Sequence, residues 1–283
     1  MNHSLDPKKN YLFNLNHLGI LDLLGPSSRE FLQGQISCDV REVSTSQMRQ
    51  GALCNLKGRV LALMDVVDHE GLKVILPAAL HESTQASLNK PAALSRVLIK
   101  KDETYDVYGF YLQNNEDICI FDKKKETERY DVIPLEGGCV YSRGHNLFIV
   151  ILDKAKRDAF VAPFIKNNQW LDRHPWHIQS LRVGQFEIYP ETRGLFLPHR
   201  LGLHESGHLS FNKGCYKGQE IIARMHYRST LKHTLKIMER ETTDMLAPGQ
   251  PLFSEDKQTQ LGEIIDVAPM EEHHVIVVAS VLI

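Results

Sequence analysis

One short stretch of the chain combines a thiol, two lysines and two glycines: Lys213-Gly214-Cys215-Tyr216-Lys217-Gly218-Gln219-Glu220. The apolar-periodic run that follows predicts a helix beginning just after the second glycine. A thiol close to a helix N-terminus and to ammonium groups is favoured as the thiolate, the form that acts as a nucleophile. Backbone N–H groups of such a turn can also hold an anion. We therefore take Cys215 as the candidate functional thiol, while a buried, inert cysteine in a glycine-rich connector stays open as the alternative.

A second pattern, His204-Glu205-Ser206-Gly207-His208, matches the H-E-x-x-H spacing of zinc hydrolases. That chemistry requires a helix, because only there do two histidines four residues apart share a face. Ser206 and Gly207 are poor residues for a helix interior, and no apolar periodic segment surrounds the motif. A short pattern also arises easily by chance in a chain with 14 histidines. We expect no metal site.

Several further segments occur in a fixed order with the cysteine octapeptide. They are Gly25–Val40 (GPSSREFLQGQISCDV), Gly51–Arg59 (GALCNLKGR), Phe196-Leu197-Pro198 and Leu209-Ser210-Phe211. Together they resemble the signature segments of the YgfZ family, whose octapeptide reads K-G-C-[FY]-x-G-Q-E. These are folate-binding proteins related to the T-protein of the glycine cleavage system. The resemblance covers most of the chain and implies tetrahydrofolate or a derivative as cofactor.

The resemblance also implies positions for the folate contacts. The folate-contacting tryptophan of the family falls on Trp176, whose indole could stack on a pterin or aminobenzoate ring, although a packed core tryptophan is the alternative. A second tryptophan known in some members falls near Leu18, so one stacking partner is missing. Arg182 stands where relatives commonly carry an acid; it could clamp the glutamate tail of folate, or Glu187 or Glu191 could replace the acid. The expected contacts are completed by Asn55, Arg59 and Arg224.

The activity that the resemblance implies is a supporting one. T-protein enzymes use an aspartate on the strand after the first β-turn, and those positions hold Ala62 and Leu63 here, with Asp65 on a shifted register. Without a positioned acid or base, aminomethyl transfer loses its proton-transfer catalyst. The expected function is therefore a folate-binding accessory protein for iron–sulfur enzymes and tRNA methylthiolation, with a folate-dependent one-carbon transferase as the alternative. The expected partners are reduced folate and iron–sulfur enzymes or assembly factors, and direct tRNA binding is left open.

Composition agrees with an ordinary globular protein. The chain has 283 residues, 42% hydrophobic and 24% charged, and a net charge of -2. Such a balance argues against a dominant nucleic-acid-binding role, although a local basic face is compatible with it. Five scattered cysteines without a C-x-x-C pair favour free thiols in a reducing compartment. With no apolar run that could span a bilayer, we expect a cytoplasmic protein without a membrane partner.

The elements that must position these residues indicate an α+β fold. Strand patterns over 10–15, 52–77, 94–100 and 105–112 alternate with helix patterns over 27–34, 78–89, 153–167 and 170–184, and only short strand patterns follow residue 229. The helix over 78–89 is expected to stop before Pro91. With the T-protein-like architecture that the resemblance implies, we assign residues 1–50 and 101–205 to a discontinuous α+β folate-binding domain, 51–100 to an inserted α+β subdomain, 206–229 to the signature loop and helix, and 230–283 to an antiparallel β-barrel.

Overall fold

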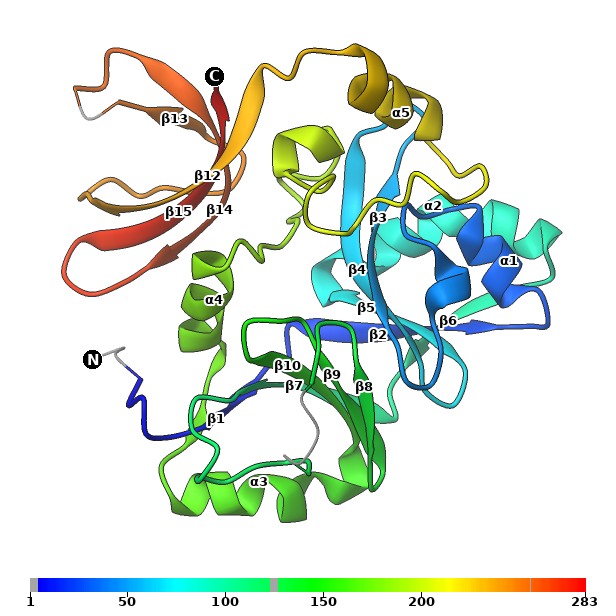
Figure 1. Ribbon diagram of the computed structural model, residues 1–283, viewed down its shortest axis with the longest axis vertical. Coiled ribbons are helices and arrows are strands. Elements are labelled where there is room, and N and C mark those ends of the chain that lie inside the picture. The colour runs from blue at the N-terminus through cyan, green and yellow to red at the C-terminus, as the bar shows by residue number, and fades with distance from the viewer. Residues whose placement is uncertain (1–4, 123–126, 255) are drawn as a thin grey trace.

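A computed structural model describes residues 5–122, 127–254 and 256–283, which form three β-sheets with helices between and around them (Figure 1). The first sheet has six strands in the order β11-β1-β7-β10-β9-β8. Its strands are β1 (Tyr11–Asn14), β7 (Tyr105–Tyr111), β8 (Val132–Leu135), β9 (Gly138–Ser142), β10 (Leu147–Asp153) and β11 (Trp170–Leu171). Strand β10 is buried along nearly its whole length, which shows that both faces of this sheet are covered.

The second sheet has five antiparallel strands in the order β3-β4-β5-β2-β6. They are β2 (Leu18–Leu24), β3 (Arg49–Cys54), β4 (Val60–Asp68), β5 (Leu72–Pro77) and β6 (Leu98–Asp102). Strand β2 lies between β5 and β6, although its residues were assigned to the first unit of the chain. The domain boundaries stay predictions, but sheet pairing joins β2 to β5 and β6 of the segment that was predicted as an insertion.

The two sheets lie in the middle of a layered body. Helix α3 (Arg157–Lys166) covers the outer face of the six-stranded sheet, while α1 (Ser28–Gln33) and α2 (His81–Leu94) pack on the other side of the five-stranded sheet (Figure 1). Side chains of β10 alternate between the layers, as the period of two in a strand requires: Phe148, Val150 and Leu152 meet α3, and Leu147, Ile149 and Ile151 face inward.

The chain then leaves the six-stranded sheet through α4 (Arg173–Arg182) and passes a short 3-10 helix (Pro198–Leu201) before α5 (Gln219–Arg228). Three more 3-10 turns occupy Val40–Glu42, Ala78–Leu80 and Lys154–Lys156. Helix α5 begins where the sequence predicted it, directly after Gly218. Helix α2 runs through Pro91, so the expected stop before it is wrong. Pro91 lies in the last turn, where it removes only one backbone donor while the carbonyls of the turn stay bonded to Ser95 and its neighbours.

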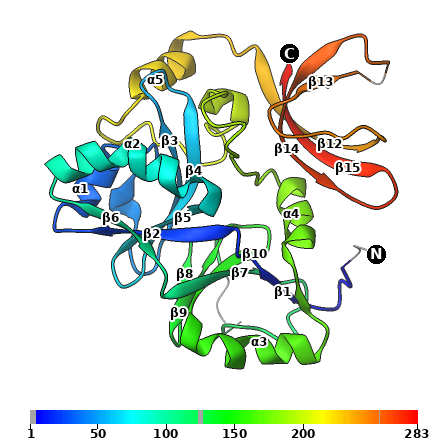
Figure 2. The same cartoon turned by 180° about the vertical axis from the view of Figure 1, so that it is seen from behind.

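The C-terminal strands form a separate four-stranded antiparallel sheet in the order β12-β15-β14-β13, at the place where the barrel was expected. They are β12 (His233–Glu241), β13 (Pro251–Phe253), β14 (Gln260–Pro269) and β15 (His274–Leu282). Seen from behind, this curved sheet stands beside α4, away from α1 and α2 (Figure 2). A register shift between Ile264 and Asp266 turns the Asp266 carboxylate toward the connecting segment, where it accepts from Tyr189 and pairs with His177 at 3.0 Å. None of the helices in the described ranges has the length and apolar content of a membrane span.

Candidate functional site

The signature loop is fixed to the protein by the buried ammonium group of Lys213. Its Nζ atom donates to three backbone carbonyls, those of Gln33 at 2.7 Å, Ile36 at 2.7 Å and Cys38 at 2.6 Å. An ammonium has three donors, so this lysine is fully used. Burial lowers the pKa of Lys213 to about 8, which leaves it charged at neutral pH. Lys213 therefore anchors the loop and is not free to activate the neighbouring thiol.

The second glycine of the loop makes a close backbone contact with the β3–β4 turn. Gly218 has φ +86°, and a Cβ atom there would lie 2.6 Å from the carbonyl oxygen of Asn55. Asn55 shapes this turn, because its side-chain oxygen accepts from the backbone N–H groups of Lys57 at 2.9 Å and Arg59 at 3.0 Å. Gly58, also at positive φ, lies against Ile221 of α5. The two signature segments that the sequence separates by more than 150 residues thus form one joint.

Cys215 is displayed outward from this joint. It is exposed, whereas Tyr216 beside it is buried with the Lys213 ammonium 5.0 Å above its ring. Three other cysteines are buried, and burial raises the pKa of each of their thiols to about 12. These are Cys38, Cys54 and Cys139. The loop therefore presents Cys215 to solvent, whereas burial keeps the other three in the inert thiol form.

Asn55, Arg59 and Arg224, which were predicted as cofactor contacts, belong to the joint and its surface. Arg59 donates to the carbonyl oxygen of Leu195, and Asn55 is committed to its own turn. Arg224 is exposed on α5, as is Glu220, while Gln219 is half-buried. None of the three predicted contacts lines the central cavity described next.

A narrow cavity of about 70 Å³ lies between the five-stranded sheet, the segment 184–188, the loop 201–208 and the first strand of the C-terminal sheet. Leu18 and Leu63 supply apolar wall, and Glu187 and Gln185 supply polar groups. The Glu187 carboxylate accepts from His17 at 2.8 Å and lies 3.9 Å from Arg173. Although burial opposes it, the hydrogen bond from His17 lowers the pKa of Glu187. The buried Oε1 atom of Gln185 has no hydrogen-bond partner among the described residues.

Asp65 lies on the same cavity, two residues along β4 from Leu63 and hence on the same face of the strand. Asp65 therefore faces the cavity, and its shift along the strand from positions 62 and 63 stays a prediction. Its carboxylate is already engaged by Tyr141 at 2.8 Å, Arg143 at 2.6 Å and Gln50 at 3.1 Å. Burial and the Asp65 charge raise the pKa of the Tyr141 phenol, so it stays protonated and donates. Asp65 thus ends in a closed polar network.

Two predicted folate contacts lie elsewhere. Trp176 is 3% exposed, and its ring packs 5.6 Å from that of Phe13 and directly over Gly109. Trp176 is thus a packed core tryptophan, the alternative stated above, because an indole covered by Phe13 and Gly109 cannot stack on a ligand. Arg182 lies in a different hollow between α4 and the β14–β15 turn, where it pairs with Glu239 at 3.3 Å. Of the two acids suggested as replacements, Glu187 lies on the central cavity and Glu191 is exposed outside it.

The H-E-x-x-H residues form turns and no helix, with Gly207 at φ +79°. His208 reaches the central cavity and bonds through Nδ1 to the Ser206 hydroxyl at 2.9 Å. Burial lowers its pKa to about 4, so it is neutral. His204 instead packs against His199, with ring centroids 4.9 Å apart and the rings tilted by 37°. The two histidines thus lie in different environments and do not face a common point. No cluster of metal-binding side chains occurs in the part of the chain that the structure describes.

Sequence reasoning missed three residues of the cavity network: Gln50, Tyr141 and Arg143. Gln50 lies opposite Asp65 on the neighbouring strand β3 of the same sheet. Tyr141 and Arg143 come from β9 and the turn after β9, so they meet Asp65 only through the contact of two sheets. A polar residue in an otherwise apolar strand was the available signal for Asp65, since a buried carboxylate requires a partner. Nothing in the local sequence indicated which partner it would find.

Comparison with known proteins agrees with the motifs. No protein-family model matches the chain. The chain is 27% identical over 258 residues to the "tRNA-modifying protein YgfZ" of Colwellia psychrerythraea, covering 89% of this chain and 77% of that protein. It is 26% identical over 263 residues to the protein of the same name from Escherichia coli O157:H7, with the same coverage. The predicted resemblance to the YgfZ family is confirmed.

The fold agrees as well. The crystal structure of glycine cleavage system aminomethyltransferase T from Bartonella henselae superposes with a TM-score of 0.75, covering 97% of this chain and 79% of that one. At 14% sequence identity this likeness establishes the fold alone. The predicted α+β, T-protein-like fold class is confirmed.

Proposed function

We propose that this chain is an accessory protein of tRNA modification that binds a reduced folate and supports iron–sulfur enzymes. The observation that carries the proposal is the similarity to tRNA-modifying YgfZ proteins over 89% of the chain, together with a signature loop that is anchored from beneath and presents Cys215 to solvent. A thiol held this way can meet a client protein. One thiolate cannot hold a cluster alone, so cluster contact requires ligands from a partner. The cytoplasm is the expected compartment.

The reduced folate is assigned to the central cavity. The aminopyrimidine ring of a pterin presents N–H donors, and the cavity offers two acceptors for them, the Glu187 carboxylate and the unpartnered Oε1 atom of Gln185. Leu18 and Leu63 provide apolar wall for the rings. Small-molecule sites enclose roughly 300–1,000 Å³, so the cavity of about 70 Å³ must widen when the ligand enters. The segment 184–188 and the C-terminal sheet bound it on one side and are the parts that would move.

A one-carbon transferase is less well supported. The strand positions that carry the catalytic acid in T-proteins hold Ala62, which is buried, and Leu63, which faces the cavity. Asp65 is nearby, but Arg143, Tyr141 and Gln50 engage it. A carboxylate whose oxygens already accept from an arginine, a tyrosine and a glutamine is poorly placed to act as a general base. We therefore assign binding, and not group transfer, to this cavity.

Calorimetric titration with 5-formyl-tetrahydrofolate tests the folate assignment. Saturable binding by the wild type, weakened at least tenfold in Glu187→Gln, is expected because the variant removes a charged acceptor. Glu191→Gln is the matched control: it makes the same chemical change at an exposed acid outside the cavity and should bind as the wild type does. Equal affinity of all three proteins, or no binding by any, would overturn the assignment.

The cellular role is tested in an Escherichia coli strain that lacks its own YgfZ protein. Expression of this chain should restore methylthiolated adenosine in tRNA, measured by mass spectrometry of tRNA digests. Cys215→Ser should fail to restore it, whereas Cys119→Ser, at a partly buried cysteine away from the signature loop, should succeed. Full restoration by Cys215→Ser would show that the thiol is dispensable and would remove the loop from the proposal.

A further inference from the structure

The surface around the signature loop carries an excess of positive charge. Within residues 213–236, six basic residues stand against one acid, Glu220, although the whole chain has a net charge of -2. Lys213 is buried, and its ammonium donates to three backbone carbonyls. The other five lie at least partly in solvent: Lys217, Arg224, Arg228, Lys232 and Lys236. The β3–β4 turn adds the exposed Lys57 and Arg59, held against α5 by the contact of Gly58 with Ile221.

These cations are available to a ligand. Across the described residues, no carboxylate pairs with Lys57, Lys217, Arg224 or Arg228. Arg224 and Arg228 are four residues apart on α5, so they lie on one face of the helix. Their spacing suits successive phosphates of a nucleic-acid backbone, which basic side chains bind without regard to sequence.

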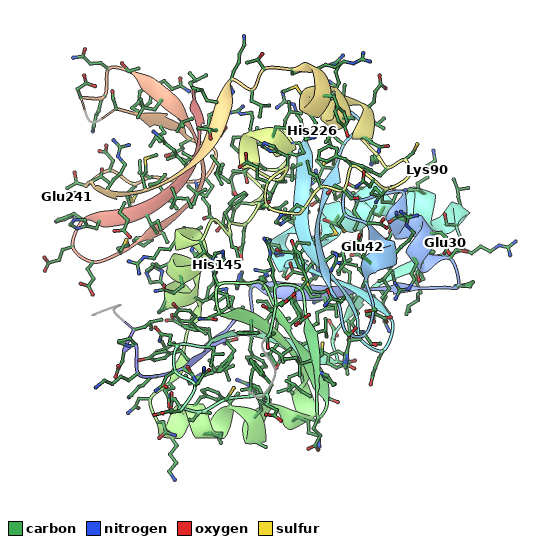
Figure 3. All side chains as sticks on the ribbon, viewed as in Figure 1. Glu30, Glu42, Lys90, His145, His226 and Glu241 are labelled. Atoms are coloured by element: carbon green, nitrogen blue, oxygen red, sulfur yellow. The ribbon has the colours of Figure 1, made fainter. Side chains whose placement is uncertain are left out.

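The same helix carries an aromatic platform. Tyr227 is 67% exposed and lies between the two arginines in sequence. The centroid of its ring lies 4.7 Å from that of His226 and 6.0 Å from that of Phe211. The rings of His226 and Phe211 are stacked, with centroids 3.9 Å apart and an interplanar angle of 18°. Figure 3 labels His226 beside the loops that lie under α5. Exposed rings beside arginines are the groups on which unpaired bases stack.

We infer that the exposed side of α5 and the adjoining 55–59 turn form an RNA-binding face, which takes the phosphate backbone and an unpaired base of a folded RNA. This deepens the proposed role in tRNA modification and rests on it for the choice of RNA. Charge alone would also suit an acidic protein, but Tyr227 between two unpaired arginines favours an RNA, because an unpaired base can stack on the ring while the arginines hold the phosphates. The face adjoins the signature loop, because α5 begins directly after Gly218 and the 55–59 turn lies against Gly218 and Ile221.

The test is fluorescence anisotropy with a fluorescein-labelled, unmodified tRNA transcript, repeated over a range of salt concentrations. The wild type should bind, and its affinity should fall as salt rises. Arg224→Glu/Arg228→Glu should weaken binding by about tenfold or more. The slope of log affinity against log salt concentration should become shallower by about one for each lost phosphate contact. Tyr227→Ala should weaken binding about tenfold while leaving the salt dependence unchanged.

The matched control is Arg157→Glu/Lys166→Glu on α3, which makes the same charge change on exposed helical residues at the opposite end of the molecule (Figure 1). It should bind the transcript as the wild type does. Equal loss in both double variants would mean general attraction without a site and would overturn the inference. Displacement of the transcript by polyglutamate, with Tyr227→Ala binding normally, would instead identify a face for acidic proteins and would overturn it too.

Folate titration of the same double variant separates this inference from the proposed function. Arg224 and Arg228 do not line the central cavity, so the variant should bind 5-formyl-tetrahydrofolate as the wild type does. Normal folate binding with unchanged tRNA binding would remove the RNA face and leave the folate assignment standing. Loss of tRNA binding in the double variant, together with no folate binding by the wild type, would instead support the RNA face and remove the folate assignment.

Discussion

Gly218 and Asn55 are in backbone contact across the two signature segments: a Cβ atom on Gly218 would lie 2.6 Å from the Asn55 carbonyl oxygen. Because Asn55 also organises the β3–β4 turn through two side-chain hydrogen bonds, the position of the signature loop depends on the shape of that turn. The contact places α5 on the five-stranded sheet and leaves Cys215 outside. Asn55 and Gly218 therefore belong to the functional loop even though neither touches the central cavity.

Gly218→Ala should destabilise the protein. The added Cβ atom meets a backbone oxygen and must also adopt φ +86°, which together should cost about 2–3 kcal/mol of unfolding free energy. Urea denaturation followed by circular dichroism measures this cost. Gly214→Ala is the control, because a Cβ atom there has nothing within 4 Å. Equal midpoints for the two variants would show that the joint is not closely packed in solution.

Lys213→Met should release the signature loop. The substitution leaves the carbonyls of Gln33, Ile36 and Cys38 without their donor, and a charged hydrogen bond contributes about 1.5–3 kcal/mol. We expect an overall loss of about 2–4 kcal/mol, and faster labelling of the buried Cys38 by a thiol reagent. Lys217→Met, at the half-buried lysine on the other side of the thiol, should keep nearly full stability. Wild-type stability of Lys213→Met would contradict the anchoring role.

Asp65→Ala should be costly because it leaves Arg143 in a largely buried position without its carboxylate. Removing one member of such a pair costs about 3–5 kcal/mol. The double variant Asp65→Ala/Arg143→Met removes both charges and should recover part of that loss. Denaturant midpoints of the two single variants and the double variant measure the coupling. Strictly additive effects would show that Asp65 and Arg143 are not paired.

The sequence was sufficient for the motifs and the class of fold, but not for the faces that the side chains present. The helix after Gly218 followed from its apolar period, since that signal is local. Trp176 was assigned to the ligand because it lies at a fixed distance from Cys215, yet α4 turns this side chain onto Gly109 and Phe13, a choice made by the packing of distant strands. The cavity position of Asp65 could not be predicted for the same reason: which face of β4 borders the cavity depends on segments 184–188 and 201–208, more than 100 residues away.

The free energy of unfolding should fall between pH 7 and pH 5 because of two histidines, the buried His199 and the partly buried His208. Burial lowers the pKa of His199, and that of His208, to about 4, against about 6.5 in the unfolded chain. The unfolded state therefore binds more protons in this window, so the stability is complete above pH 6.5 and is lost as the pH falls toward 4. Neighbouring His204 and His226 lower the pKa of His199 further, and neither of its ring nitrogens has a partner among the described residues.

Each of these histidines should contribute on the order of 1–3 kcal/mol to that pH dependence. Urea midpoints at pH 5, 6 and 7 measure it. His199→Phe keeps a ring of similar size without a titrating nitrogen, so its stability should vary less with pH and should exceed that of the wild type at pH 5. His145→Gln changes an exposed histidine and should follow the wild-type curve (Figure 3). Identical pH profiles of His199→Phe and the wild type would mean that His199 protonates freely in the folded protein, and that the histidine cluster under α5 is open to water.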